Sequence, residues 1–395
     1  MNKQLNVCLL NDSFPPVLDG VANVVLNYAQ IIHSSFGSAV VAVPRYPGAN
    51  YDYPFPVVHY PSIKTPKTAG YRTGIPLLGV LRELTDYPID IIHCHCPFIS
   101  SLIAKRLRHA TGAPVIMTYH TKFDVDFENV FDSNLLQTAA KKIIVSNIES
   151  CDDIWAVSRG AGENMKSLGC GRDYMVMDNG VDFPKGPAEE KHIREISNEL
   201  GLSDDIPVFL YVGRMMWYKG IALTLNGLMK AKSEGSRFKM VFVGGGGDFD
   251  EITELSRRND LENECIFTGP IRDREKLRAI YSRADMFLFP STFDSAPMAV
   301  REASACGLAS VLIRGSSSAE PVTDGRNAVL IDEDAESLAR AVIELSKNKE
   351  YMNALGQRAM DDLYLPWDTV VGRAYERYCE VLGSNSTLRT KEANK

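Results

Sequence analysis

Short apolar runs alternate with segments of helical period along this chain, and the whole series occurs twice. Nearly continuous apolar runs are typical of strands buried on both faces of a parallel sheet, which the intervening helices cover. The first series comprises Leu5–Leu10, Ala39–Val43, Ile89–His93, Val115–Tyr119, Asp153–Ala156 and Tyr174–Met177. The second comprises Val208–Val212, Lys239–Val243, Cys265–Thr268, Met286–Phe289 and Ser310–Ile313. The pattern predicts an α/β protein with two Rossmann-like, doubly wound domains.

The domain boundaries follow from a polar, charged stretch between the two series. We expect a first domain over residues 1–183, a linker over 184–206 and a second domain over 207–365. Residues 366–383 have helical period, and residues 384–395 form a polar tail that we expect to be disordered. Doubly wound sheets bind ligands beyond the carboxyl ends of their strands. The loops after the predicted strands are therefore the candidate functional segments.

Composition and charge exclude several classes of protein. The first residues hold an apolar run too short for a signal peptide, and no later run reaches the roughly 18 apolar residues of a membrane span. The 8 cysteines are scattered, which favours reduced thiols over disulfides. The net charge of -7 argues against a nucleic acid partner, which requires a basic surface. We therefore expect a soluble protein of the cytoplasm.

The loop after the first predicted strand contains Pro15 and Pro16 and ends at Gly20, where a helical segment begins. A bent loop of this kind lets the backbone approach a ligand, and the free N–H groups of a helix start attract an anion. A plain connection between strand and helix explains the same residues. Phosphate binding near Gly20 and a structural turn therefore both remain open.

Two cations lie in the corresponding loop of the second half, which follows the predicted strand 208–212. The loop begins at Gly213, contains Arg214 and Lys219, and leads into a predicted helix. Fixed cations at a helix N-terminus form an anion site suited to a diphosphate, although surface loops also carry such residues. The next strand is followed by a glycine-rich turn with Gly244, which lacks the spacing of a dinucleotide fingerprint.

Two carboxylates follow the predicted strand Met286–Phe289. Asp294 lies in the loop after this strand, and Glu302 lies in the helical segment that comes next. Carboxylates at such a position are good acceptors for the hydroxyl groups of a sugar or a ribose. A helix-capping Asp and a solvated Glu are the alternative explanation.

Histidine and cysteine alternate at the end of the predicted strand Ile89–His93. Because strand side chains alternate between the two faces, His93 and His95 share one face while Cys94 and Cys96 take the other. This alternation splits any four-ligand metal cluster, and zinc sites favour a wider spacing of cysteines. We therefore expect no metal site here.

Taken together and in this order, these segments resemble the retaining GT-B glycosyltransferases of family 4 over nearly the whole chain. The family's Gly-Arg-x4-Lys-Gly loop matches residues 213–220, which implies that Arg214 and Lys219 hold the diphosphate of a donor nucleotide sugar. The family's Glu-x7-Glu motif falls on Asp294 and Glu302, and the second position binds the nucleotide ribose. Asp294 is shorter than the usual Glu by one carbon–carbon bond, about 1.5 Å, which alters its expected contact with the donor sugar.

The resemblance also implies an architecture and a mechanism. Two domains face a central cleft, and the last helix, 366–383, crosses back to the first domain. His120 matches the histidine that lies beside the donor sugar, and it completes a catalytic set with Arg214, Lys219 and Asp294. The reaction needs no protein nucleophile, metal or cofactor, because the cations and helix N-termini stabilise the leaving diphosphate.

A finer resemblance is to the branch of diacylglycerol glucosyltransferases and phosphoinositol mannosyltransferases. It rests on residues 95–98, 104–105, 118–121, 61–63 and 71–72. It implies an acceptor side at His95 and Phe98 and peripheral association with the inner face of the membrane. Residues 121–128 oppose this, since they carry three acidic side chains and only one basic side chain, whereas an interfacial surface favours basic and aromatic residues. Lys105–Arg108 and Lys141–Lys142 are the candidate basic patches, which solvated helix faces explain equally well.

The resemblance thus implies a retaining hexosyltransferase that uses UDP-glucose or UDP-galactose, with GDP-mannose as the alternative donor. The expected acceptor is diacylglycerol or another glycolipid precursor. Fold alone does not fix function, so two alternatives stay open. One is a catalytically silent subunit that binds a nucleotide sugar, and the other is a sugar-nucleotide 2-epimerase, which uses a similar two-domain frame.

Overall fold

The structure is a computed structural model that describes residues 4–17, 19–49, 51–64, 72–76, 78–122 and 133–393. Tyr71 and residues 123–128, which bear on the predicted acceptor, lie outside the described residues. The chain divides into two compact units: unit 1 comprises Met1–Gly180 and Trp367–Lys395, and unit 2 comprises Val181–Pro366. Each unit is built on one large parallel sheet, which confirms the predicted pair of Rossmann-like domains.

The sheet of unit 1 has the strand order β3-β2-β1-β6-β7-β8-β9. Its strands are β1 (Leu5–Leu10), β2 (Gly37–Pro44), β3 (Val57–Tyr60), β6 (Ile91–Cys94), β7 (Val115–Tyr119), β8 (Asp153–Ala156) and β9 (Met175–Val176). A separate antiparallel pair is formed by β4 (Ser62–Lys64) and β5 (Arg72–Gly74). The strand order reverses between β1 and β6, and such a reversal opens a crevice beyond the carboxyl ends of the two strands.

The helices of unit 1 connect these parallel strands. They are α1 (Gly20–Ile31), α2 (Leu78–Thr85), α3 (Ile99–Thr111), α5 (Asn134–Glu149), α6 (Arg159–Ser167) and α14 (Trp367–Ala393), with a π-helical turn η1 (Ile32–Phe36) after α1. Capping residues set some of their starts. Ser158, for example, accepts a hydrogen bond from the N–H of Ala161 at the beginning of α6 (3.1 Å).

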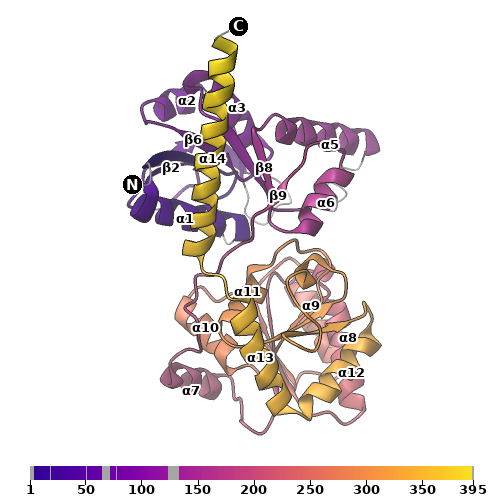
Figure 1. The fold of residues 1–395 in the computed structure, drawn as a ribbon. Coiled ribbons are helices and arrows are strands. Elements are labelled where there is room, and N and C mark those ends of the chain that lie inside the picture. Colours follow the sequence, from indigo (N-terminus) through magenta and orange to yellow (C-terminus); the bar gives the residue numbers. More distant parts are fainter. Residues whose placement is uncertain are drawn as a thin grey trace. The chain divides into compact units, whose positions relative to one another are not determined.

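The helix α14 packs along α1 although it comes from the far end of the chain (Figure 1). Tyr378 hydrogen-bonds Nδ1 of His93 at 2.6 Å, and the Arg377 guanidinium donates to both carboxylate oxygens of Asp153 at 2.7 and 3.1 Å. The Tyr378 ring also stacks on Trp155. The helix continues to Ala393, where the sequence had indicated a disordered tail.

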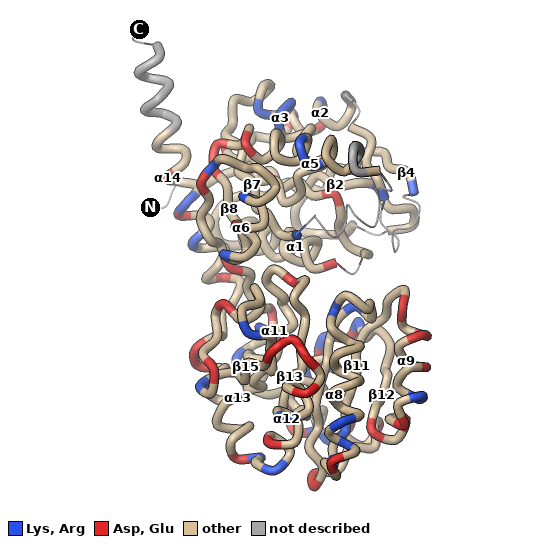
Figure 2. The backbone as a smooth tube through the Cα atoms, turned by 90° about the vertical axis from the view of Figure 1, so that its right-hand side faces the viewer, with Lys and Arg blue, Asp and Glu red and all other residues tan. Residues whose placement is uncertain are grey.

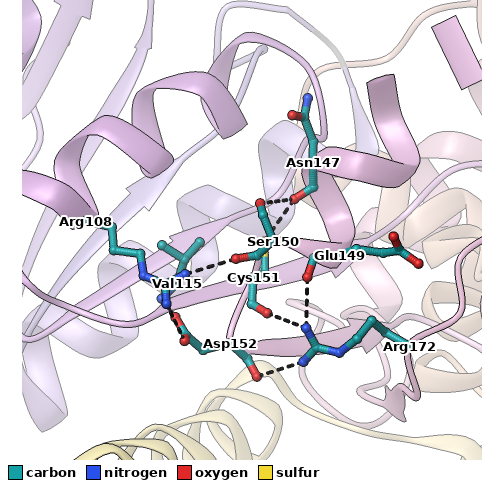
Figure 3. A network of polar contacts seen from close by, with 8 residues as sticks. All are labelled: Arg108, Val115, Asn147, Glu149, Ser150, Cys151, Asp152 and Arg172. Atoms are coloured by element: carbon teal, nitrogen blue, oxygen red, sulfur yellow. Dashed lines mark hydrogen bonds and ion pairs between the residues drawn. The ribbon is translucent and has the colours of Figure 1, made fainter. Parts of the chain in front are cut away.

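A polar network joins the end of α5 to the start of β8 (Figure 3). The Arg172 guanidinium donates to three backbone carbonyls, those of Glu149, Cys151 and Asp152. The Asp152 carboxylate accepts from the N–H of Val115 and from Arg108, both at 2.8 Å. These bonds satisfy carbonyl groups that a helix end leaves without intrahelical partners. They therefore fix where β8 enters the sheet.

The sheet of unit 2 has the strand order β12-β11-β10-β13-β14-β15. Its strands are β10 (Val208–Val212), β11 (Lys239–Val243), β12 (Cys265–Gly269), β13 (Met286–Phe289), β14 (Ser310–Ile313) and β15 (Ala328–Ile331). Its helices are α7 (Glu190–Glu199), α8 (Ile221–Ser233), α9 (Phe249–Arg258), α10 (Arg274–Arg283), α11 (Met298–Ala305), α12 (Ala335–Ser346) and α13 (Lys349–Leu363), with short 3-10 turns η2 (Trp217–Lys219) and η3 (Ser317–Ala319). The order reverses between β10 and β13, as in a Rossmann sheet.

Residues 184–206, which the sequence indicated as a linker, belong to unit 2 and contain α7. Ile196 is buried, and Ile193 and Leu200 pack against the core of this unit. Their spacing places one narrow apolar stripe on an otherwise charged helix. The strands β3 and β15 were also not predicted. Within the described ranges, none of the helices combines the length and apolar character that crossing a bilayer requires.

Candidate active site

The loops that follow β10 and β13 meet at the reversal point of unit 2. These two strands are direct neighbours, with Phe209 opposite Met286 and Leu210 opposite Phe287. The loop after β10 carries the predicted donor residues 213–220, and the loop after β13 carries Asp294. Residues far apart in sequence are thus brought to the edge where open α/β sheets bind ligands.

Two glycines allow the loops after β10 and β11 to touch. Gly244 has a φ of 143°, and a Cβ at this position would lie 1.9 Å from the carbonyl oxygen of Gly213. The N–H of Gly213 donates to Val243 at 3.0 Å. A side chain at Gly244 would force the two loops apart, so the glycine-rich turn serves to pack the backbone closely at this edge.

Gly220 places the start of α8 against the end of β13. Its φ of 75° lies in the left-handed region, and a Cβ would lie 2.1 Å from the carbonyl oxygen of Pro290. Gly220 is also the N-cap of α8, and no side chain caps this helix. Its first N–H groups and the positive end of its dipole therefore form an anion-binding position beside the loop after β13.

Arg214 and Lys219 both lie near one aromatic ring, that of Tyr218. The guanidinium carbon of Arg214 is 6.0 Å from the ring centroid, and Nζ of Lys219 is 5.5 Å from it. Lys219 is buried in η2, whereas Arg214 is exposed. The two cations that the sequence assigned to the same diphosphate therefore share an aromatic neighbour.

Lys219 forms an ion pair with Asp294. Its Nζ lies 2.5 Å from Oδ1 of Asp294, and Oδ2 of Asp294 accepts from the hydroxyl of Ser291 at 2.6 Å. Nζ also lies 5.0 Å from the ring centroid of Phe293. The lysine side chain is 7% exposed and the aspartate side chain 19%. The sequence assigned Lys219 to the donor diphosphate and Asp294 to the donor sugar. It did not indicate that the two side chains form an ion pair with each other.

Glu302 is buried in α11, and both its carboxylate oxygens have donors from α10. Arg274 donates to Oε1 at 2.8 Å, and the hydroxyl of Tyr281 donates to Oε2 at 2.9 Å. The same nitrogen of Arg274 also bonds Asp182. Glu302 is therefore not solvated, which was the alternative considered for it from the sequence. Arg274 and Tyr281 were missed, since nothing in their spacing marks them.

The loop after β1 is shaped by two aspartates, and Pro15-Pro16 in it is a cis peptide bond. Asp19 precedes Gly20 as the N-cap of α1 and accepts from the N–H of Val21. Asp12 accepts from the first N–H groups of α3, and burial raises the pKa of its carboxyl group. Gly20 thus begins a helix whose N-cap is already supplied by Asp19.

Three histidines lie together at the carboxyl ends of β6 and β7. Nδ1 of His95 is 3.0 Å from Nε2 of His120, and the rings of His93 and His95 are 4.0 Å apart. Burial lowers the pKa of His120 to about 3 and holds those of His93 and His95 well below their usual value. All three imidazoles are therefore neutral at pH 7, so His120 can accept or donate a hydrogen bond but supplies no positive charge.

Phe98 lies at the N-cap of α3, and its side chain is 37% exposed. It belongs to the same strand-to-helix loop as His95, which is buried. The two predicted acceptor-side residues therefore differ in exposure and in contacts. Phe98 presents an apolar surface to solvent, whereas the buried His95 contacts His120.

A pocket of about 370 Å³ in unit 1 lies away from these residues. It is lined by polar groups that include Arg108, Arg172 and Arg377, and by Asp153 at the first position of β8. It therefore lies at the amino end of this strand, opposite to the edge where such sheets bind ligands. Among the described residues, no group of three or more His, Cys, Asp or Glu side chains is arranged to hold a metal ion.

Comparison with known protein families accounts for most of the chain. Residues 18–184 match the model of Glycosyltransferase Family 4, and residues 192–362 match that of Glycosyl transferases group 1. The chain belongs to the GT-B glycosyltransferases. It is thus an enzyme of the class that transfers a sugar from a nucleotide sugar.

Relatives of this glycosyltransferase differ in donor and acceptor. It is 24% identical over 398 residues to a GDP-mannose-dependent alpha-mannosyltransferase of Corynebacterium glutamicum, covering 98% of this chain and 91% of that protein. It is 21% identical over 311 residues to an alpha-monoglucosyldiacylglycerol synthase of Streptococcus pneumoniae, covering 77% and 70%. The solved structure of Anabaena HepE in complex with UDP and glucose superposes with a TM-score of 0.77 at 16% identity, covering 95% of this chain and 100% of HepE.

Proposed function

We propose that this glycosyltransferase moves a hexose from a nucleoside diphosphate sugar to an acceptor hydroxyl with retention of the anomeric configuration. The observation that carries the proposal is the group of Arg214, Lys219 and Asp294 beside the uncapped start of α8. Two cations and a helix dipole there suit a diphosphate, and a carboxylate suits the hydroxyl groups of the attached sugar.

In this mechanism the bond between the anomeric carbon and the diphosphate oxygen breaks as the acceptor oxygen forms its bond on the same face. Arg214, Lys219 and the N-terminus of α8 stabilise the negative charge that grows on the leaving diphosphate. The acceptor proton passes to an oxygen of that phosphate. Asp294 positions the donor, because its two oxygens keep lone pairs for the sugar hydroxyl groups besides those that Lys219 and Ser291 engage.

The donor we favour is UDP-glucose or UDP-galactose, with GDP-mannose as the alternative. Support comes from relatives named for glucosyl and mannosyl transfer and from the structurally similar HepE complex with UDP and glucose. Ribose is common to all these donors, and Glu302 is the residue to which we assign it. Discrimination between sugars then falls to Asp294, whose short side chain is anchored by Lys219.

The acceptor we propose is a membrane lipid, diacylglycerol or another glycolipid precursor, at the inner face of the membrane. Support comes from four large apolar side chains of unit 1 that face solvent: Ile63, Ile75, Phe98 and Leu102. Their segments adjoin, since Gly74 of β5 lies against Ile99 of α3, and Arg106 donates to the carbonyl of Pro76 at 3.1 Å. An exposed apolar cluster of this kind suits a lipid surface.

Two further observations bear on location and partners. All 8 cysteines are free, which is typical of the reducing cytoplasm. Basic and acidic residues are interspersed in both units (Figure 2). Lys105 and Arg108, from a candidate basic patch, bond Asn147 and Asp152 within unit 1. We therefore propose a cytoplasmic enzyme that reaches the membrane through apolar contacts, and we propose no nucleic acid partner.

A donor panel tests this function. The purified chain is mixed with UDP-glucose, UDP-galactose and GDP-mannose, with and without vesicles that contain diacylglycerol, and free nucleoside diphosphate, glycolipid and co-sedimented protein are measured. We expect one donor to be consumed at least about tenfold faster than the others, and only with vesicles that also bind the protein. Normal donor binding without turnover would instead indicate a silent subunit, and a changed sugar on an intact nucleotide would indicate an epimerase.

A second test concerns the metal. We propose that Arg214, Lys219 and the dipole of α8 perform the charge stabilisation that a divalent ion provides in other transferases. Turnover with the preferred donor is therefore expected to stay within about twofold of its value after chelation with excess EDTA. The proposal of metal-independent transfer fails if EDTA abolishes turnover and added Mg²⁺ or Mn²⁺ restores it.

A further inference from the structure

Glu302 keeps unused acceptor capacity although both its oxygens are engaged. An ionised carboxylate offers about four lone-pair positions, and Arg274 and Tyr281 occupy one on each oxygen. The remaining lone pairs are enough for the two adjacent hydroxyl groups of a ribose. The donors from α10 therefore set the direction in which the free lone pairs of Glu302 point.

Arg274 is itself held in place by groups outside α11. Its guanidinium lies 4.3 Å from the ring centroid of Phe183, and the nitrogen that bonds Glu302 also bonds Asp182. Burial disfavours its charge, but Glu302 and Asp182 outweigh this and raise its pKa. The guanidinium is thus a fixed cation between two carboxylates.

The contact of Arg274 with Glu302 does more than join two helices. Its Nε is buried and has no hydrogen-bond partner among the described residues. A buried, unpaired N–H group opposes folding, so the placement of Arg274 carries a cost in stability. What the placement does achieve is to hold the carboxylate of Glu302, a residue that is 8% exposed, in one orientation.

We propose that Arg274 is a positioning residue, which holds the Glu302 carboxylate aimed at the ribose hydroxyl groups of the donor nucleotide. This rests on the proposed function, because it assumes that Glu302 receives the ribose. It adds a residue outside the loop and carboxylate motifs, which acts through Glu302 and is itself held by Asp182 and by the ring of Phe183. Tyr281 assists from the second carboxylate oxygen.

The test uses nucleotides that lack one ribose hydroxyl. Calorimetry gives the affinities of UDP, GDP and their 2′-deoxy and 3′-deoxy analogues for the unmodified chain, Arg274→Met and the control Lys276→Met. Lys276 lies on the same helix and pairs with Glu199 at the surface. We expect the loss of a hydroxyl to weaken binding about tenfold in the unmodified chain and in Lys276→Met. In Arg274→Met this penalty should fall below about threefold, because the carboxylate is no longer held.

Each other outcome decides the question. An unchanged deoxy penalty in Arg274→Met would show that the arginine is merely structural and would overturn the proposal. Nucleotide binding with no deoxy penalty in the unmodified chain would overturn it too, while leaving the proposed transferase intact. Absence of any nucleotide binding would overturn the proposed function itself. If Arg274→Met does not fold, Tyr281→Phe, which removes only a hydroxyl, is expected to reduce the same penalty, and an unchanged penalty there overturns the proposal.

Discussion

Lys219→Met is expected to lower turnover by a factor of about 100 to 1,000 and to destabilise unit 2 by about 3 kcal/mol. The first effect is typical of removing one preorganised group that stabilises transition-state charge. The second arises because Asp294, 2.5 Å from Nζ, loses the cation that compensates its burial. Breaking a buried pair costs about 3–5 kcal/mol, and the partial exposure of Asp294 places this pair at the lower end. Urea unfolding measures the stability, and nucleoside diphosphate release measures turnover.

The double variant Lys219→Met with Asp294→Asn separates the two effects. Removing both charges leaves no uncompensated ion, so we expect at least half of the lost stability to return while turnover stays low. The control is Lys230→Met, which breaks the exposed pair with Glu336 between α8 and α12 and should leave the midpoint of urea unfolding almost unchanged. A double variant as unstable as the sum of its single variants would mean that the pair does not exist in solution.

Arg214→Ala is expected to lower turnover by about a hundredfold with no measurable change in unfolding. Arg214 is exposed on the loop after β10, and substitutions at exposed positions usually change stability little. Arg214→Lys should recover part of the turnover, because it restores the charge but not the planar fork that binds phosphate in a bidentate manner. Arg257→Ala, an exposed arginine of α9 that pairs with Glu254, is the matched control. Equal turnover in Arg214→Ala and this control would remove Arg214 from the proposed diphosphate site.

The parts of the fold that the sequence predicts are those where local pattern and burial agree. The strands β1, β7, β8, β10 and β11 begin and end at the predicted residues, because both faces are buried and the apolar runs are continuous. The strand β3, Val57–Tyr60, includes His59 and alternates in burial, so it lacks such a run. The sequence indicates a linker at the helix α7 because charged residues outnumber its two apolar positions, Ile193 and Ile196.

The residues of the candidate site were also predicted only in part. Loop position and motif placed Arg214, Lys219, Asp294 and Glu302 after the right strands, and their roles remain predictions. Lys219 and Asp294 are 75 residues apart, and they pair because β10 and β13 are neighbouring strands. This strand order cannot be deduced from residue spacing along the chain. The hydrogen bond between His95 and His120 likewise needs β6 beside β7.

The return of α14 to unit 1 bears on how the protein is made. A ribosome that adds about 5–20 residues per second needs roughly 10–40 s to synthesise unit 2 once Gly180 has been added. During that interval His93 lacks Tyr378, Asp153 lacks Arg377, and unit 1 lacks the buried apolar side chains of α14. Unit 2 is continuous in sequence and has all its strands as soon as it emerges. The unit that is synthesised first is therefore the last to be completed.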